Sequence, residues 1–421
     1  MLTASPQPIP TVIHQHAEEA AHLRHVRSVL VAAPHVKLHQ LRRLDDRIAA
    51  HLDGLAVAGE YGTGICEAAI ETPGVGEVFA AAVRAIEDKD ERRLDKLFAL
   101  VGAVPDARPG LVSAFGWVSG AYLRGTAAML LASGDAFKRQ VGIAACAMHG
   151  VDPGDALVQA IADAEPGLRA RALRAAGELG RHDLLAVCMA ALSDADAACR
   201  FWAAWSSVLL GDRSKAVSVL GSHVLAPNPF RNRALRLVLK VLDPATAQQV
   251  LGFEARDPAN KRVLIQGAGI AGDGQYLPWL IGQMADDKFA RLAGESFSMI
   301  TGLDLAYLGL ERKPPENVEA GPTENPDDEN VEMDPDDSLP WPDAAKIQAW
   351  WQTNQTRFQS GMRYFMGEPP SVPRCRKVLR EGFQRQRVAA AEYLCLLQPG
   401  APLFNTAAPA WRQQRWLAKV E

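Results

Sequence analysis

Apolar residues recur at helical spacing along most of the chain. In residues 163–180, "DAEPGLRARALRAAGELG", Leu168, Ala172 and Leu179 lie on one face of a predicted helix. The segment opens with an aspartate and closes with a glycine. An aspartate at a helix start accepts hydrogen bonds from free backbone N–H groups, and a glycine after the end adopts the left-handed conformation that stops a helix. The pattern predicts one short amphipathic helix.

This segment repeats with a period of about thirty residues. The closing glycines are 30 or 31 residues apart, or twice that across one missing position near Val241: Gly120, Gly150, Gly180, Gly211, Gly272 and Gly302. A second short apolar segment follows each glycine, so each unit is predicted to be a helix pair. One pair cannot bury its apolar face alone, whereas stacked pairs can. The sequence therefore predicts an all-α fold, an α-solenoid (α-α superhelix) of helix-pair repeats.

Charged residues at the start of each unit keep the same phase. An arginine follows the opening aspartate by four to six residues in several units. Because the arginines recur in register, we interpret them as structural and predict a ladder of ion pairs along the stack. Its members are Asp163, Arg169, Asp194, Arg200, Asp257, Arg262, Asp286 and Arg291. Arg169 is expected to pair with Asp163 or Asp194, while Arg171, Arg174 and Arg181 are left open between a solvated face and a rim contact.

Composition changes divide the chain into four predicted segments. Residues 1–100 form an N-terminal helical cap, and residues 101–311 hold the repeats. Residues 312–340 carry ten acids against two bases and many prolines, which is typical of a disordered insertion. Residues 341–421 carry twelve bases against five acids and include one further repeat-like unit. We expect the acidic insertion to fold back onto this basic C-terminal region.

Bulk composition is that of an ordinary globular protein. The 421 residues are 48% hydrophobic and 22% charged, with a net charge of −4, so bulk charge does not indicate a nucleic-acid partner. Six scattered cysteines contain no C-x-x-C pair and fit a reducing cytoplasm. The N-terminus has no basic head followed by an apolar core, and no stretch is long and apolar enough for a membrane span.

Motifs for catalysis or cofactors are weak. The string "GAGIAG" (267–272) matches a dinucleotide fingerprint, but its last glycine keeps the repeat period, which favours close helix packing. Seven histidines precede residue 52, and His35 and His39 would share a helix face, yet no ligand set completes a metal site. The acidic string 326–337 lacks the glycine of a calcium-binding EF-hand loop. We expect no catalytic residue, no cofactor and no metal.

The predicted interaction surface is the inner face of the solenoid, formed by the second helix of each pair. Gln159, Met189 and Gln283 are candidates for that surface. The adjacent Trp350 and Trp351 cannot both face one side of a helix, so one is expected in the core and the other exposed as an anchor for a partner. Trp202 and Trp205, three residues apart, are expected to pack in the core.

The periodic pattern over residues 108–305 resembles the short HEAT-like repeats of phycobilin-lyase-type proteins. Strings such as "AHLDGLAVAGEYG" (50–62), "VGIAACAMHGVDPG" (141–154) and "AAWSSVLLGDRSKAV" (203–217) also resemble a family of uncharacterised bacterial HEAT-like proteins often encoded near type VI secretion genes. That resemblance implies a cytoplasmic adaptor or chaperone whose protein client is a secreted effector or spike component. Two other classes remain open: an enzyme with a carboxylate site in the concave groove, and a nucleic-acid binder acting through the basic C-terminal region.

Overall fold

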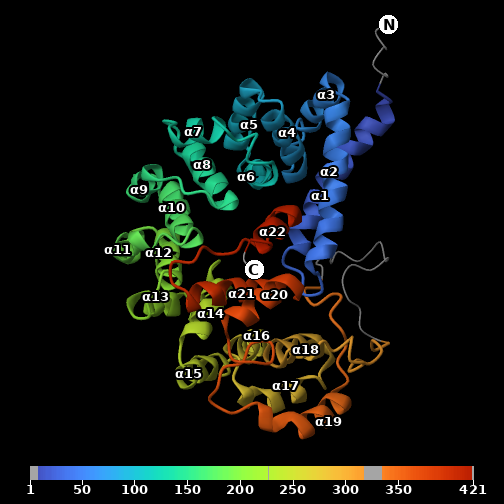
Figure 1. Ribbon diagram of the computed structural model, residues 1–421, viewed down its shortest axis with the longest axis vertical. Helices are drawn as coiled ribbons and strands as arrows, with labels where there is room; N and C mark the ends of the chain where they lie inside the picture. Colours follow the sequence, from blue (N-terminus) through green and yellow to red (C-terminus); the bar gives the residue numbers. More distant parts are fainter. Residues whose placement is uncertain (1–7, 226, 317–333, 420–421) are drawn as a thin grey trace. The chain divides into compact units, whose positions relative to one another are not determined.

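The protein is built from helices. The computed structural model describes residues 8–225, 227–316 and 334–419, which form 22 α-helices and six short 3-10 helices, with no β-strand in these ranges (Figure 1). The predicted all-α solenoid of stacked helix pairs is therefore the observed fold class.

The helices are grouped into two compact units. Unit 1 comprises residues 1–32, 36–206 and 400–421, and unit 2 comprises residues 33–35 and 207–399. The division falls within one repeat helix and again after residue 399. A C-terminal segment, residues 400–418, lies in the same unit as the N-terminal helices.

Unit 1 begins with two long helices and continues with short pairs. Its helices are α1 (Pro10–Leu30), α2 (Leu38–Val57), α3 (Glu60–Ala69), α4 (Val75–Glu87), α5 (Glu91–Ala103), α6 (Arg108–Trp117), α7 (Thr126–Leu131), α8 (Ala136–His149), α9 (Asp155–Ile161), α10 (Pro166–Glu178), α11 (Leu185–Ala190), α12 (Ala197–Leu209, which crosses the division) and α22 (Ala410–Leu417). A core of buried aliphatic and aromatic side chains runs from α1 through α8.

Unit 2 continues the helix pairs and then departs from them. Its helices are α13 (Lys215–Val224), α14 (Arg231–Val241), α15 (Pro244–Glu254), α16 (Lys261–Ala271), α17 (Leu277–Gln283), α18 (Asp287–Thr301), α19 (Ala344–Asn354), α20 (Val372–Glu381) and α21 (Gln384–Leu397). Its core surrounds α16, α17 and α18, and α19 packs against α17.

The first helices of successive pairs stack on one another. In unit 1, α6, α8 and α10 pack in that order, and in unit 2, α14, α16 and α18 do the same. A glycine permits the closest approaches: a Cβ on Gly177 of α10 would lie 2.8 Å from the Ser206 Cα of α12, and one on Gly269 of α16 would lie 2.9 Å from the Ser296 Cα of α18. The glycine-rich string 267–272 thus serves helix packing, as the repeat period predicts.

Most of the predicted helix ends have the expected geometry. Asp135 and Asp286 accept hydrogen bonds from backbone N–H groups at the starts of α8 and α18. The glycines that follow the first helices of the pairs have positive φ angles: Gly150, Gly180, Gly211, Gly272 and Gly302. Gly120 does not have a positive φ angle, because α6 already ends at Trp117, three residues before the predicted stop.

Candidate interaction surfaces

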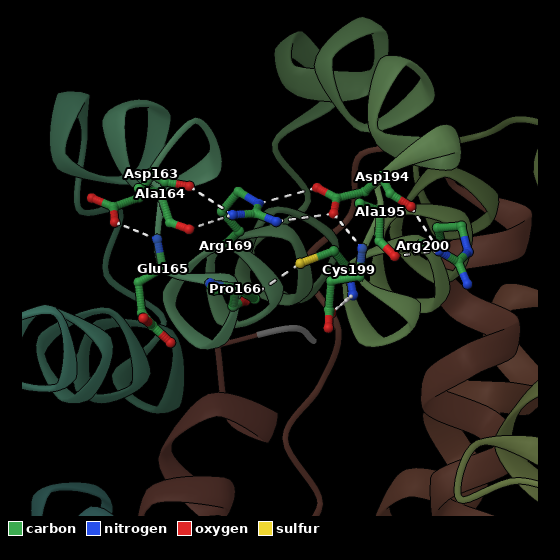
Figure 2. A network of polar contacts seen from close by, with 10 residues as sticks. Asp163, Ala164, Glu165, Pro166, Arg169, Asp194, Ala195, Cys199 and Arg200 are labelled. Carbon is green, nitrogen blue, oxygen red and sulfur yellow. Dashed lines mark hydrogen bonds and ion pairs between the residues drawn. The ribbon is translucent and has the colours of Figure 1, made fainter.

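Arginine–aspartate pairs join successive repeats in unit 1, and Figure 2 shows the pair of Arg169 with Asp194. Arg139 of α8 pairs with Asp163 at 2.8 Å, and Arg169 of α10 donates to both carboxylate oxygens of Asp194 at 3.0 Å. Of the two acids considered for Arg169, Asp194 of the next repeat is therefore the ion-pair partner. Asp163 instead offers its backbone carbonyl to the same guanidinium at 2.9 Å.

Arg169 and Arg200 also hydrogen-bond the backbone just before their own helices. Arg169 donates to the carbonyls of Asp163 and Ala164, and Arg200 donates likewise to those of Asp194 and Ala195. The hydrogen bonds from Arg169 lower the pKa of the Asp194 carboxyl, and those same bonds raise the pKa of Arg169. Both shifts favour the ionised pair, which fixes the spacing between two repeats.

In unit 2 the ladder takes its acids from another part of the chain. Arg262 of α16 donates to both carboxylate oxygens of Asp336 at 2.7 and 2.6 Å, and Arg291 of α18 pairs with Asp334. The Asp334 side chain also accepts from the backbone N–H of Asp336, just as Asp194 accepts from that of Asp196. Residues 334–336 thus have the local geometry of a repeat start, although they lie outside the periodic part of the sequence.

The two aspartates predicted for the unit 2 ladder have other roles. Asp286 pairs with Lys261, the residue before Arg262, at 2.9 Å. Asp257 accepts a hydrogen bond from the backbone N–H of Ala259 at the start of a 3-10 helix. The expected pairing of these acids with the repeat arginines is therefore wrong in unit 2, because Asp334 and Asp336 occupy the arginines instead.

The remaining arginines of residues 163–181 are engaged within unit 1. Arg171 and Arg174 both donate to the Glu178 carboxylate, at 2.8 and 2.7 Å. The Arg174 guanidinium also lies 4.7 Å from the centre of the Trp202 ring. Arg181 pairs with Asp152 and Asp183. These contacts assign the three side chains, left open by the sequence, to the structure of the stack.

The acidic segment 312–340, predicted to be disordered and to fold back onto the C-terminal region, is described only in part. Residues 317–333 lie outside the described residues, and with them most of the acids. The following residues are packed rather than disordered, since Asp334 and Asp336 hold two repeat arginines. Contacts with the basic C-terminal region come from both ends of the insertion. Arg385 of α21 donates to the Pro335 carbonyl at 2.8 Å, and the Arg312 N–H donates to the Trp341 carbonyl at 2.8 Å.

Two first helices lack a closing glycine, and arginines from the C-terminal region take over its role. In unit 1, the buried Arg412 of α22 donates to the carbonyls of Gly116, Trp117 and Val118 at the end of α6. The last carbonyls of a helix have no hydrogen-bond donor within the helix, so a guanidinium there can donate to them. Its positive charge also interacts favourably with the negative end of the helix dipole. Arg412 therefore caps α6, whose predicted glycine is absent from that end.

Arg363 performs the same task in unit 2. Its guanidinium donates to the carbonyls of Leu239, Lys240 and Leu242 at the end of α14, at 2.8, 2.5 and 2.5 Å. Its Nε donates to Ala271 at the end of α16. The missing glycine near Val241 is thus compensated by a side chain more than 120 residues further along the chain.

Backbone groups of the C-terminal region continue this row of contacts. In unit 1, the Leu403 N–H donates to the Glu178 carbonyl at the end of α10. In unit 2, the N–H groups of Tyr364 and Met366 donate to Gly272 and Met299, at the ends of α16 and α18. The ends of α6 and α10 in unit 1, and of α14, α16 and α18 in unit 2, are therefore occupied by the chain itself.

A buried ion pair connects α14 with α21 inside unit 2. The side chains of Lys240 and Glu392 are 2% and 5% exposed, and they are in direct contact. Arg236 approaches the same carboxylate at 3.5 Å. Burial alone would raise the pKa of Glu392, but Lys240 and Arg236 hold that pKa below its ordinary value. Nothing in the sequence pattern indicates this pair.

The second helices of unit 1 lie on the opposite side from the C-terminal segment (Figure 1). Gln159 of α9 is exposed, while Met189 of α11 and Gln283 of α17 are half-buried. The structure adds a signal that the sequence analysis missed. Met129, Val158 and Val187 are exposed apolar residues on α7, α9 and α11, spaced 29 residues apart.

The tryptophan expectations have different outcomes. Trp202 and Trp205 are buried, as predicted. Trp351 is buried too, but Trp350 is half-buried and packs against Phe297 and Phe358. Trp350 is therefore half-buried rather than exposed, and its role as an anchor for a partner stays a prediction.

The chemistry of catalytic or metal sites is sparse. All six cysteines are buried and free, and burial raises the pKa of Cys66 and Cys375 to about 11. The histidines near the N-terminus do not form the arrangement considered for a metal site, because His35 precedes α2 and does not share a helix face with His39.

In the part of the chain that the structure describes, no three His, Cys, Asp or Glu side chains are grouped to hold a metal ion. No helix within those ranges has both the length and the apolar character of a membrane span.

Comparison with known proteins identifies one matching family. Residues 154–240 match the family described as HEAT repeats. The match covers α9 to α14 and contains the Arg169–Asp194 pair. No curated protein and no solved structure matches the sequence.

Proposed function

We propose that this chain is a non-enzymatic protein-binding scaffold whose partner lies on the second helices of the repeats. HEAT repeats commonly mediate protein interactions, and the chain carries a HEAT-repeat match over residues 154–240. A stacked row of short helices presents equivalent positions at regular intervals, which suits recognition of an extended partner.

The observation that carries this proposal is the difference between the two sides of the stack. The ends of the first helices are filled by Arg363, Arg412 and backbone groups of the C-terminal region. The second helices of unit 1 instead expose one apolar side chain per repeat. Met129, Val158 and Val187 are 47%, 41% and 39% exposed, so each offers apolar area that a partner would bury. Gln159 next to Val158 supplies a hydrogen-bonding group, and Met189 of α11 belongs to the same row of second helices in unit 1. Gln283, on α17 of unit 2, is a separate candidate on the second helices of that unit.

The finer proposal is a cytoplasmic adaptor or chaperone for a bacterial type VI secretion effector or spike component. It rests on the resemblance of several sequence strings to proteins encoded near such genes. The genes that neighbour the coding sequence provide its direct test: a secretion cluster is expected, and an unrelated neighbourhood would remove this role while leaving the scaffold proposal intact.

The nucleic-acid alternative receives less support from the C-terminal region. Arg363, Arg385 and Arg412 donate to protein carbonyls or carboxylates, so these three side chains are already engaged. Phosphate binding needs arginines and lysines that are free to replace counterions.

Site-specific photo-cross-linking tests the scaffold proposal. A photoreactive amino acid replaces Val158 or Val187 in separate variants, and a third variant carries it at the exposed Lys96 of α5 as the control. The two second-helix positions should cross-link to the same protein, and Lys96 should not. If all three positions capture the same proteins, or if Val158 and Val187 share none, the proposed surface is wrong.

A further inference from the structure

A groove between the two N-terminal helices is the strongest unassigned surface of unit 1. It has a volume of about 450 Å³. The lining residues are Glu19, His22, Leu23, Val26 and Leu30 of α1 and Gln40, Arg43, Leu44 and Arg47 of α2. On each helix these positions are mostly three or four residues apart, so each set forms one stripe along its helix.

The floor of the groove is apolar and its rim is polar. Leu23 and Leu44 are buried at 3% and 7% exposure, and Val26 and Leu30 are half-buried against the same core. His22, Gln40, Arg43 and Arg47 are exposed along the edges. An exposed rim over an apolar floor is the arrangement of a helix-binding groove rather than of a closed cavity.

The charge of the rim is predominantly basic. Arg47 lies 3.9 Å from Glu19, the one acid in the lining, and its side chain is 62% exposed. Arg43 makes no ion pair or hydrogen bond with the described residues. A free guanidinium beside an apolar floor favours a ligand that brings carboxylates together with apolar side chains.

The length of the groove suits a helix better than a small anion as its ligand. The α1 stripe from Glu19 to Leu30 extends for about 16 Å at the rise of an α-helix. Val26 and Leu30 keep part of their apolar surface accessible between the polar edges, and a third helix lying along the slot would bury that surface. A small anion on Arg43 would leave it in contact with water.

We propose that the α1–α2 groove binds an acidic amphipathic helix of a partner protein. The apolar side chains of that helix contact Leu23, Val26, Leu30 and Leu44, and its carboxylates pair with Arg43 and Arg47. This inference rests on the proposed scaffold function and adds a second contact surface to it, separate from α7, α9 and α11.

The test uses the full chain and a designed, fluorescently labelled peptide of about four helical turns. The peptide carries leucine at helical spacing with glutamate beside the leucine stripe, and a matched peptide carries lysine in place of each glutamate. Fluorescence anisotropy measures both affinities against wild type, Arg43→Glu, Val26→Asp and the double variant Arg43→Glu/Arg47→Glu. Arg92→Glu, at an exposed position of α5, is the matched charge control.

Wild type and Arg92→Glu should bind the acidic peptide at least tenfold more tightly than the basic one. Arg43→Glu and Val26→Asp should each weaken the acidic peptide about tenfold, which corresponds to about 1.4 kcal/mol. The double charge reversal should invert the preference in favour of the basic peptide. Circular dichroism and thermal melting establish that the exposed-site variants keep their fold.

Equal affinity of wild type for the two peptides, absence of binding, or an unchanged preference in the double variant would each overturn the inference. Val158→Asp should leave peptide affinity unchanged, because it lies on the second-helix surface. Failure of the peptide test with successful cross-linking at Val158 would therefore reject the groove and retain the scaffold, and the reverse result would reject the second-helix surface.

Discussion

Units 1 and 2 complete the same repeat pattern with residues from different places. In unit 1, the ladder arginines Arg139 and Arg169 pair with aspartates of the next repeat. In unit 2, Arg262 and Arg291 pair with Asp336 and Asp334, which lie 74 and 43 residues further along the chain. Periodicity therefore determines which positions need a partner, while a non-periodic segment supplies the partner wherever the repeat series does not.

The largest expected loss of stability comes from breaking the buried ion pair of unit 2, which is not part of the arginine–aspartate ladder. Lys240→Met should lower the free energy of unfolding by about 3–5 kcal/mol, because it removes the buried partner of Glu392 and leaves the partly exposed Arg236, at 3.5 Å, to balance that charge. The double variant Lys240→Met/Glu392→Met should recover most of that loss. Urea denaturation measures both, and equal destabilisation by the single and double variants would show that the charge pair itself does not matter.

The next effect concerns the two arginine caps. Arg412→Met should open the end of α6 in unit 1, and Arg363→Met the end of α14 in unit 2, each at a cost of about 2–3 kcal/mol. Hydrogen exchange should locate the loss in the unit that holds the cap. Arg415→Met, at an exposed position of α22, is the matched control and should leave α6 protected. Faster hydrogen exchange at α14 in the Arg412→Met variant would contradict the expectation that each arginine cap stabilises only its own unit.

Smaller changes should follow from single ladder acids. Asp194→Asn weakens the pair with Arg169, and Asp334→Asn weakens the pair with Arg291, at about 1–2 kcal/mol each. The two variants should differ in proteolysis. Asp334→Asn should expose residues 334–340 to cleavage, while Asp194→Asn should leave that segment resistant. Similar cleavage in both variants would contradict separate sources of ladder acids.

A further effect is the pH dependence that His149 gives to the stability of unit 1. His149 of α8 hydrogen-bonds the Phe115 carbonyl, and burial together with the nearby Arg412 lowers its pKa to about 4. The unfolded chain binds this proton near pH 6.5 and the folded chain only near pH 4, so stability is lost as pH falls through that interval. His149→Gln should flatten this dependence in urea denaturation between about pH 7 and pH 4.5. An unchanged slope would show that other groups, such as His51, account for it.

The parts of the fold with a periodic signal were predictable from the sequence. The repeat period located the helix pairs, the left-handed glycines from Gly150 to Gly302, and the partner of Arg169 among two aspartates. Each of these features depends on residues within one or two repeats. The local pattern carries that information because a helix start, a helix end and a neighbouring repeat lie close in sequence.

Interactions between distant segments had no such signal. Arg363 and Arg412 resemble any other arginine of a basic region, and nothing local shows that they satisfy carbonyls of α14 and α6. Adjacent residues cannot both face one side of a helix, which predicts that one of Trp350 and Trp351 is exposed. Trp351 is buried, but Trp350 is only half-buried because Phe297 and Phe358 pack against it from other elements. The groove between α1 and α2 was missed because its apolar floor resembles ordinary core in the sequence.

The return of the C-terminal segment to unit 1 has a consequence for biosynthesis. The Leu403 and Arg412 contacts with α10 and α6 join parts of the chain that leave the ribosome more than two hundred residues apart. At ordinary translation rates, the ends of α6 and α10 would stay uncapped for roughly ten seconds or more after they emerge. A nascent chain interrupted before residue 400 would present those free carbonyls to proteases and chaperones. Unit 1 can therefore complete its structure only after translation has passed that point.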